Sequence, residues 1–299
     1  MAASSVRSAM WRNGKARVGL VLAGLFLLMA VVGPLVAGDP LAFVGVPHDA
    51  PSAVHWLGTT GQGQDVLAQT LVGAGPTLLV ALLTGALTVG IGALIGGLAG
   101  FLGGRVDDGL SLLMNVFLVM PGLPLMVVLA AWLPTGPVTM VLVLSLTGWA
   151  WHARVIRAQS LALRRRDFVV AALMSGERPL RVLVVEVLPN MASLLASSFV
   201  GATTYAVGAQ VGLEFLGLGD VGAVTWGTNL YWAANDSALL TGAWWTFVPT
   251  GLSVALVGFG LTLIGFGLDE VTNPRLSSPR APGLPVGQPP GSTPVVRRG

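Results

Sequence analysis

The sequence predicts an all-α integral membrane protein with six transmembrane helices, and three observations support this fold class. Of the 299 residues, 54% are hydrophobic and only 10% are charged, whereas a soluble domain carries about 25% charged residues. Six apolar segments approach or exceed the roughly 20 residues that a helix needs to cross the bilayer core. All 16 Lys and Arg residues lie in alternate connections between these segments.

The six predicted spans contain no Asp, Glu, Lys or Arg and cover residues 18–36, 76–104, 110–133, 137–153, 191–213 and 244–268. The first span follows a basic segment and could alternatively be a signal peptide. Its length and the lack of a clear cleavage site at Gly33-Pro34 favour a span. Pro121 and Pro124 should kink the third span, because each removes a backbone donor and clashes with the preceding turn.

The basic residues predict the orientation of the chain. With the N-terminus inside, the inside segments hold every Lys and Arg, whereas the outside loops hold none and carry six acidic residues. Because Lys and Arg stay on the cytoplasmic side of membrane proteins, both termini should be cytoplasmic. We expect a cytoplasmic N-terminal segment, a transmembrane domain, and a disordered tail rich in Pro, Gly and Ser, covering residues 1–17, 18–276 and 277–299.

The second span carries a strip of glycines spaced four residues apart, Gly92, Gly96, Gly100 and Gly104. Residues at this spacing share one helix face, and glycine lets another backbone approach it closely in a membrane. The strip predicts packing against another helix of the same chain. A subunit interface or a moving contact is the alternative.

The sequence excludes several function classes. The chain has no cysteine, and its three histidines are scattered, so no metal site or zinc hydrolase motif is present. Its one lysine, Lys15, is followed by Ala16, which rules out a P-loop for ATP. Because the basic residues lie at the ends of apolar segments, the net charge of +3 does not indicate nucleic-acid binding. We expect no enzyme activity and no cofactor. The spans hold no Asp, Glu, Lys or Arg to couple transport to protons, and His152, at the edge of the fourth span, fits an interfacial side chain better than a proton relay.

A polar segment interrupts the apolar pattern at residues 167–190. Asp167 can cap a short helix, and Gly176 can end that helix in a left-handed conformation. The side chains of Phe168, Ala171 and Ala172 should share one face, since they are spaced by three and four residues.

A second short helix should cover residues 179–187, since Pro179 suits a first turn and Pro189 should stop the helix as the fifth span begins. The segment would then form a compact helix–turn–helix element at the cytoplasmic surface, with alanines that allow a partner protein to dock closely. An ordinary amphipathic interfacial loop is the alternative interpretation.

Five motifs in this chain resemble one known family. Ala171-Ala172, Gly176 and Leu188-Pro189 match the spacing of the EAA loop of binding-protein-dependent ABC importer permeases. Asn190 after Leu-Pro is typical of the dipeptide/oligopeptide branch. Four further motifs are similar to that branch. They are HWLGTT (residues 55–60) with GQDVL (63–67), GFLGG (100–104) before Asp107, FLGLG (215–219) before Trp226-Gly227, and NPRL (273–276). The resemblance covers roughly residues 15–276.

Four positions depart from the family pattern. Val170 replaces the glutamate of the EAA triplet, and Glu186 stands where an aliphatic residue or histidine is usual. Gln64 replaces the arginine of the G-R-D motif, and Gln210 stands where glutamate is common. These changes affect the polar contacts expected with a partner ATPase, and they leave the architecture unchanged.

The resemblance implies the fold of type I ABC importer permeases, with a cytoplasmic coupling helix between spans 4 and 5. The chain would be a multi-pass permease in the plasma or inner membrane. It would form half of a pathway with a second, homologous permease, beside two cytoplasmic ATP-binding subunits and an extracytoplasmic solute-binding protein. ATP hydrolysis would occur on the partner chains. The residues implied in coupling are Phe168, Ala171, Ala172, Gly176, Leu188 and Pro189.

Peptides are the substrates that the resemblance implies, with oligosaccharides as the alternative. A secondary carrier or channel, and a membrane scaffold, are the other classes. The pathway would be lined by neutral groups, with Asn115, Thr147, Ser197, Ser198, Thr203, Thr204 and Gln210 as candidates. Each could instead bond between helices. The outside loop at residues 214–243 would help to face the binding protein. The cluster Trp226, Tyr231, Trp232, Trp244 and Trp245 fits interfacial anchoring or, alternatively, stacking on sugar rings.

Overall fold

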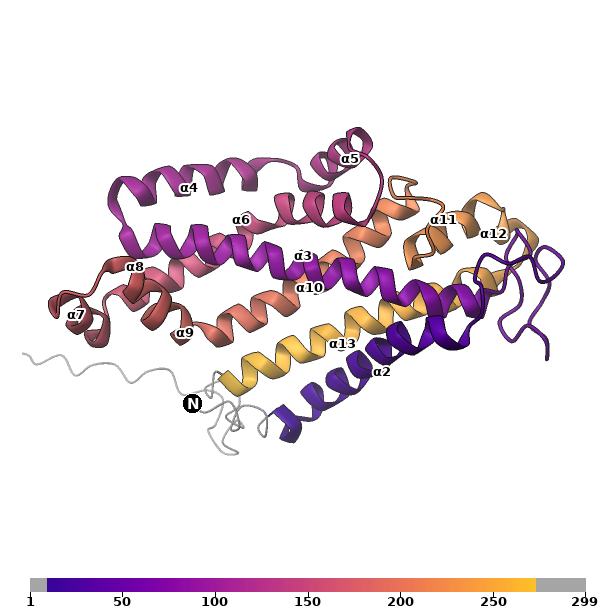
Figure 1. Cartoon of the computed structure of the whole chain (residues 1–299), viewed down its shortest axis with the longest axis horizontal. Helices are drawn as coiled ribbons and strands as arrows, with labels where there is room; N and C mark the ends of the chain where they lie inside the picture. The colour runs from indigo at the N-terminus through magenta and orange to yellow at the C-terminus, as the bar shows by residue number, and fades with distance from the viewer. Residues whose placement is uncertain (1–9, 273–299) are drawn as a thin grey trace, which may run out of the picture.

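The computed structural model describes residues 10–272 of the chain. Within that range every regular element is a helix, apart from one isolated β-bridge between Thr59 and Asp65. Five of the described helices are long and apolar enough to cross a membrane. They run side by side along the long axis of the molecule (Figure 1) and are α2 (Gly14–Val36), α3 (Val66–Leu102), α6 (Pro137–Arg164), α10 (Ala192–Phe215) and α13 (Val248–Thr272), the last preceded by the 3₁₀ turn η2 (Trp244–Thr246).

The predicted third span is a broken pair of helices. α4 (Gly104–Val119) and α5 (Gly122–Trp132) meet at an angle of 86°, so the described residues contain six spans if this pair counts as one. The prediction of a bend is confirmed, and the helix breaks completely. Met120 is extended, as expected before a proline, and Pro121 lies in the break while Pro124 fits within the first turn of α5.

Several helices extend beyond the apolar segments that predicted them. α3 begins at Val66 and not at residue 76, because the Asp65 carboxylate caps it by accepting from the Ala68 N–H at 2.9 Å. α6 continues through Arg164, well past its predicted end at residue 153. Hydropathy marks only the part of a helix that suits lipid, so it misses turns that project beyond the bilayer core.

Glycines bring the long helices together. A Cβ at Gly92, Gly96 or Gly100 would meet backbone atoms of α6, at Ala153 for the first two and at Arg157 for the third. α3 and α6 therefore pack in close contact along three of the four predicted positions. Gly104 lies outside this strip, because it begins α4 with a positive φ of 55° and has no neighbouring atom within 4 Å of the Cβ position in the described chain.

Short elements gather at the two ends of the bundle (Figure 1). One end carries α7 (Asp167–Met174), α8 (Pro179–Val182), the π-helical turn η1 (Leu183–Val187) and α9 (Leu188–Asn190). The other end carries α11 (Trp226–Asn235), α12 (Ala238–Thr241) and the folded loop before α3. The Lys and Arg residues of the described chain lie toward the α7 end. The predicted tail and the NPRL motif lie outside the described residues.

Candidate functional site

The polar segment folds as a helix–turn–helix whose first helix is α7. The backbone N–H groups of Gly176 and Glu177 close α7 by donating to the Leu173 and Ala172 carbonyls at 3.1 and 3.2 Å. Gly176 has a φ of 84°, so the predicted left-handed ending is confirmed. The predicted cap was wrong: Arg166 occupies the N-cap without a side-chain bond, and Asp167 is the first helical residue. There its charge still favours the positive end of the helix dipole.

One side chain anchors α7 to the bundle. Val169 is fully buried in a cluster that includes Phe101 of α3, Ile156 of α6 and Val182 of α8. Ala172 packs partly against the same cluster. The three residues predicted to share one face do not all do so: Ala172 turns inward, while Phe168 and Ala171 remain exposed.

The outward side of α7 is an apolar surface made by Phe168, Val170, Ala171 and Met174, which we call the α7 surface. Met174 is 83% exposed and is its most prominent member. The sequence interpretation missed Met174, although it follows Ala171 by three residues and Val170 by four. That spacing on a helix places the three on one side.

The second half of the polar segment differs from the predicted single helix. α8, η1 and α9 continue through Pro189, and Met191 makes the break before α10. The π-helical turn explains why the proline does not stop the chain: the Leu188 N–H donates to the Leu183 carbonyl five residues earlier. This wider turn accommodates the proline ring. Leu188 is half-buried and packs on the cluster that holds Val169, whereas Pro189 is exposed.

Two polar contacts join α4 to the part of α6 that leads into α7. Arg157 makes a bidentate pair with Asp107, with Nε to Oδ1 at 2.5 Å and Nη2 to Oδ2 at 2.7 Å. Arg154 donates to the Asn115 Oδ1 at 2.6 Å. Asn115, a predicted pathway residue, thus takes part in an interhelical hydrogen bond. Bidentate arginine–carboxylate pairs fix orientation as well as distance, so this contact holds α4 and α6 in register.

Four of the seven predicted pathway residues, Asn115, Thr203, Thr204 and Gln210, lie in separate places. Asn115 is beside Arg154 on the α4 side, and Thr203 is buried against Gly85 of α3. Thr204 lines a cavity of about 540 Å³ between α5 and α10. Gln210 is fully buried near the end of α10. A second cavity, of about 400 Å³, lies between α3, α4, α6 and α10 and includes Thr147.

Glu214 lies inside α10, the fifth span, which corrects the prediction that it begins an outside loop. It is 5% exposed in the last turn of α10. Its carboxylate accepts from Gln210 Nε2 at 2.8 Å and from Thr225 Oγ1 at 2.6 Å. A Cβ at Gly227 would meet its side chain, as would one at Gly219. These glycines of the FLGLG and WG motifs therefore make room for a buried carboxylate.

Trp226 belongs to the core and not to a surface aromatic cluster. It is fully buried, its Nε1 donates to the Thr70 carbonyl at 2.9 Å, and its ring meets Phe26 edge-on at 5.7 Å. Both predicted roles, interfacial anchoring and sugar stacking, were wrong for this residue because the ring joins α2, α3 and α11. Trp244 remains exposed.

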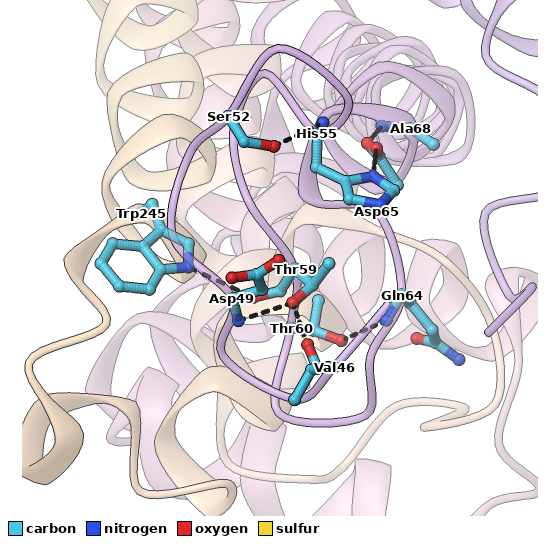
Figure 2. A network of polar contacts seen from close by, with 10 residues as sticks. All are labelled: Val46, Asp49, Ser52, His55, Thr59, Thr60, Gln64, Asp65, Ala68 and Trp245. Carbon is cyan, nitrogen blue, oxygen red and sulfur yellow. Dashed lines mark hydrogen bonds and ion pairs between the residues drawn. The ribbon is translucent and has the colours of Figure 1, made fainter. Parts of the chain in front are cut away.

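The HWLGTT and GQDVL motifs build the loop before α3. Figure 2 shows His55 against Asp65, with Nδ1 and Oδ2 at 3.0 Å, while the other oxygen of Asp65 caps α3. In the same network, the Thr59 hydroxyl donates to the Val46 carbonyl, and Trp245 Nε1 donates to the Thr59 carbonyl at 3.2 Å. These motif residues hold the loop on the helix ends.

Comparison with known proteins assigns the family. Residues 92–278 match the family described as binding-protein-dependent transport system inner membrane component. The dipeptide transport system permease protein DppC of Bacillus subtilis is 32% identical over 89% of this chain and 85% of its own length. The oligopeptide transport system permease protein OppC of Bacillus subtilis is 31% identical over 88% and 87%, and OppC of Mycobacterium tuberculosis is 32% identical over 79% and 83%.

The chain belongs to this family. It is therefore an integral membrane permease subunit of an ABC importer, working within a multi-subunit system, and not itself an enzyme. In this permease, the motifs around Asp65, Glu214 and Trp226 are structural, because their side chains are used in caps, buried bonds and core packing. Among the residues of the EAA-like motif, Ala171 is exposed on α7.

Proposed function

We propose that this permease forms half of a peptide translocation pathway, with a second, homologous permease as its partner. The main support is that this chain aligns, over most of its length and theirs, with permeases named for dipeptide and oligopeptide transport. The proposed transmembrane domain covers residues 18–276, with a cytoplasmic segment before it and a cytoplasmic tail after it.

The α7 surface is proposed as the docking site for the ATP-binding subunits. Its support is an exposed apolar surface on a short helix that is fixed to α3, α6 and α8 through Val169. Phe168, Ala171 and Ala172 would meet the partner or position the helix, and Gly176 would set the turn. Leu188 would hold the second half of the element against the same cluster, and Pro189 would shape the turn into α10.

Movement of α7 would pass to the spans as a rigid-body rotation, a known class of switching transition. α6 leads into α7 across a short connection, and the Asp107–Arg157 pair ties α4 to that end of α6. A pull on α7 would therefore move α4 and α6 together. The pathway between the two permeases would alternate between inward-open and outward-open states.

The α7 end is proposed to be cytoplasmic because the basic residues gather there. The opposite end, with the loop of Figure 2 and α11, would face an extracytoplasmic solute-binding protein. Apolar side chains are exposed on that end, among them Phe43, Val54, Trp56 and Leu240. These exposed apolar side chains would supply part of the contact with that partner.

Uptake by the reconstituted transporter tests the substrate. Proteoliposomes carrying both permeases, the ATP-binding subunits and the matching binding protein should accumulate labelled peptides only with ATP. Accumulation of oligosaccharides without peptides would overturn the peptide assignment. Uptake driven by a proton gradient in the absence of ATP would indicate a secondary carrier.

Substitution at Gly176 tests the coupling role. Gly176→Val should lower ATP-driven uptake about tenfold, because a left-handed conformation costs an L-residue roughly 1–2 kcal/mol. Gly176→Asn is the matched control, since asparagine tolerates this conformation. The comparison isolates the backbone, because a Cβ here has no neighbour within 4 Å in the described chain. Equal uptake by both variants, with ATPase still co-purifying, would contradict the coupling role.

A further inference from the structure

The cavity between α3, α4, α6 and α10 lies near the middle of the long helices, away from both the α7 end and the loop end. Its volume of about 400 Å³ falls within the roughly 300–1,000 Å³ range of small-ligand sites. Its lining includes Thr84, Thr88, Thr147, Trp151, His152 and Tyr205. The α3, α6 and α10 helices that supply most of it run side by side (Figure 1).

Two hydroxyl groups in this lining have no partner in the described part of the chain. Thr84 is 2% exposed and Thr88 is 3% exposed, and the Oγ1 atom of each is buried without a hydrogen bond. They lie one turn apart on α3, so both face the same side. Buried hydroxyls without partners are costly and rare in native structures. Each oxygen is closed to solvent in this conformation, so a ligand in the cavity would bond it after the side chain turns toward the cavity.

The other membrane threonines show that this arrangement is specific. In a helix, a threonine hydroxyl commonly donates to the carbonyl one turn earlier. Such back-bonding is made here by Thr70, Thr77, Thr147, Thr203, Thr204 and Thr262. The Thr84 and Thr88 hydroxyls make no such bond, although both belong to the same helix as Thr70 and Thr77.

The remaining lining gives the cavity its chemical character. Tyr205 donates only to the Met126 thioether, at 3.7 Å, which is a weak acceptor. Gly148 lies opposite Thr88, and a Cβ there would make ordinary van der Waals contact with Thr88 Cγ2 at 3.6 Å, so the glycine leaves the Thr88 side chain more room to turn than a larger residue would. Asp, Glu, Lys and Arg are absent from the residues that line the cavity in the described chain.

We propose that this cavity is a contact site for the backbone amides of the transported peptide, and that Thr84 and Thr88 determine its specificity. The proposal rests on the peptide transport proposed above. A hydroxyl can donate to a carbonyl and accept from an N–H, which matches both halves of an amide. Among the described residues, the lining holds no Asp, Glu, Lys or Arg, and His152 is its one imidazole, so the site offers peptide termini no carboxylate, ammonium or guanidinium partner. It therefore recognises the one chemical group that every peptide shares.

Isosteric substitution separates this role from a structural one. Thr84→Val with Thr88→Val removes both hydroxyls and preserves side-chain volume. The unfolding temperature should not fall, because the folded chain loses no hydrogen bond. Turnover of peptide uptake by the complete transporter should fall about tenfold, roughly the effect of losing one or two net hydrogen bonds. Thr84→Ser with Thr88→Ser should restore it. Thr70→Val on the same helix is the matched control, since its hydroxyl is already bonded to the Val66 carbonyl.

A backbone N-methylated peptide identifies the contacted group. Uptake is measured for a peptide and its N-methylated analogue, each at saturating loaded binding protein, and the ratio is compared between wild type and variant. Wild type should favour the unmethylated peptide, and the double valine variant should reduce that ratio several-fold. If the double variant does not assemble, each single valine variant should show a smaller change in the same direction.

The outcomes distinguish this proposal from the proposed function. A wild-type transporter that takes up no peptide contradicts peptide transport itself, whatever the variants do. Peptide uptake that is unchanged in the valine variants overturns only the amide contact. An equal loss for both peptides also overturns it, because that result indicates a structural role for the two threonines.

Discussion

Asp236 is a partly buried carboxyl that caps the C-terminal end of α11. Its Oδ2 finds no hydrogen bond among the described residues. Burial raises the pKa of Asp236 above its ordinary value of 3.8, and the neighbouring His48 acts in the opposite direction. The folded chain therefore binds this proton more tightly than the unfolded chain, so ionisation of Asp236 destabilises the fold. The penalty is absent below the ordinary pKa and is complete once the pH exceeds the raised one.

Asp236→Asn should consequently raise the unfolding temperature at pH 7, because the amide is not ionised. This advantage over wild type should shrink as the pH is lowered toward 4, where the native carboxyl is protonated as well. Thermal unfolding in detergent across this pH range checks the prediction. A difference between the two proteins that does not vary with pH would show that the charge of Asp236 does not affect stability.

Glu214 illustrates a residue whose role depends on bonds between distant segments. Glu214→Ala should destabilise the permease, because it leaves the buried Gln210 amide and the Thr225 hydroxyl without their acceptor. Each stranded group costs about 1–3 kcal/mol. Glu214→Gln keeps an acceptor oxygen and should cost less. Denaturant unfolding followed by tryptophan fluorescence measures both, and a stable alanine variant would refute the structural role.

At the scale of elements, the sequence predicted the apolar centres of the spans better than their ends. Hydropathy located α3 and α6 but missed the turns that a cap at Asp65 and an arginine-containing continuation to Arg164 add to them. Pro121 predicted a bend, but the size of the break between α4 and α5 depends on packing that the sequence pattern does not contain. The turn at Gly176 was predictable, because only a few residue types adopt its conformation.

The contact between α3 and α6 can be tested with two glycines of the same helix. A Cβ at Gly96 would collide with the backbone carbonyl of Ala153, whereas one at Gly90 meets nothing within 4 Å in the described chain. Gly96→Ala should therefore cost about 1–3 kcal/mol through overpacking. Gly90→Ala should be neutral or stabilise by up to about 1 kcal/mol. Equal unfolding temperatures for the two variants would contradict close packing along the strip.

For the candidate site, the sequence could identify only the part that depends on local spacing. Residues of α7 lie close together in the chain, so helical periodicity grouped two of the exposed ones, Phe168 and Ala171, but missed Val170 and Met174. The cavity around Thr84 and Thr88 draws on four helices, and its distinguishing property is the absence of two hydrogen bonds. Composition and spacing carry no signal of that kind, which is why the predicted pathway residues are scattered.

At the scale of the whole molecule, the segregation of charge predicts which end of the bundle faces the cytoplasm. The chain contains no cysteine, so a single introduced thiol reports its own position without a background. Ser175 is exposed at the end of α7, and Ser52 is exposed in the loop of Figure 2 at the opposite end. In right-side-out membrane vesicles, a membrane-impermeant maleimide should label Ser52→Cys directly. Ser175→Cys should react only after the vesicles are permeabilised. The reverse pattern would invert the permease and place the α7 surface out of reach of cytoplasmic ATPases. Labelling of both without permeabilisation would contradict the transmembrane arrangement itself.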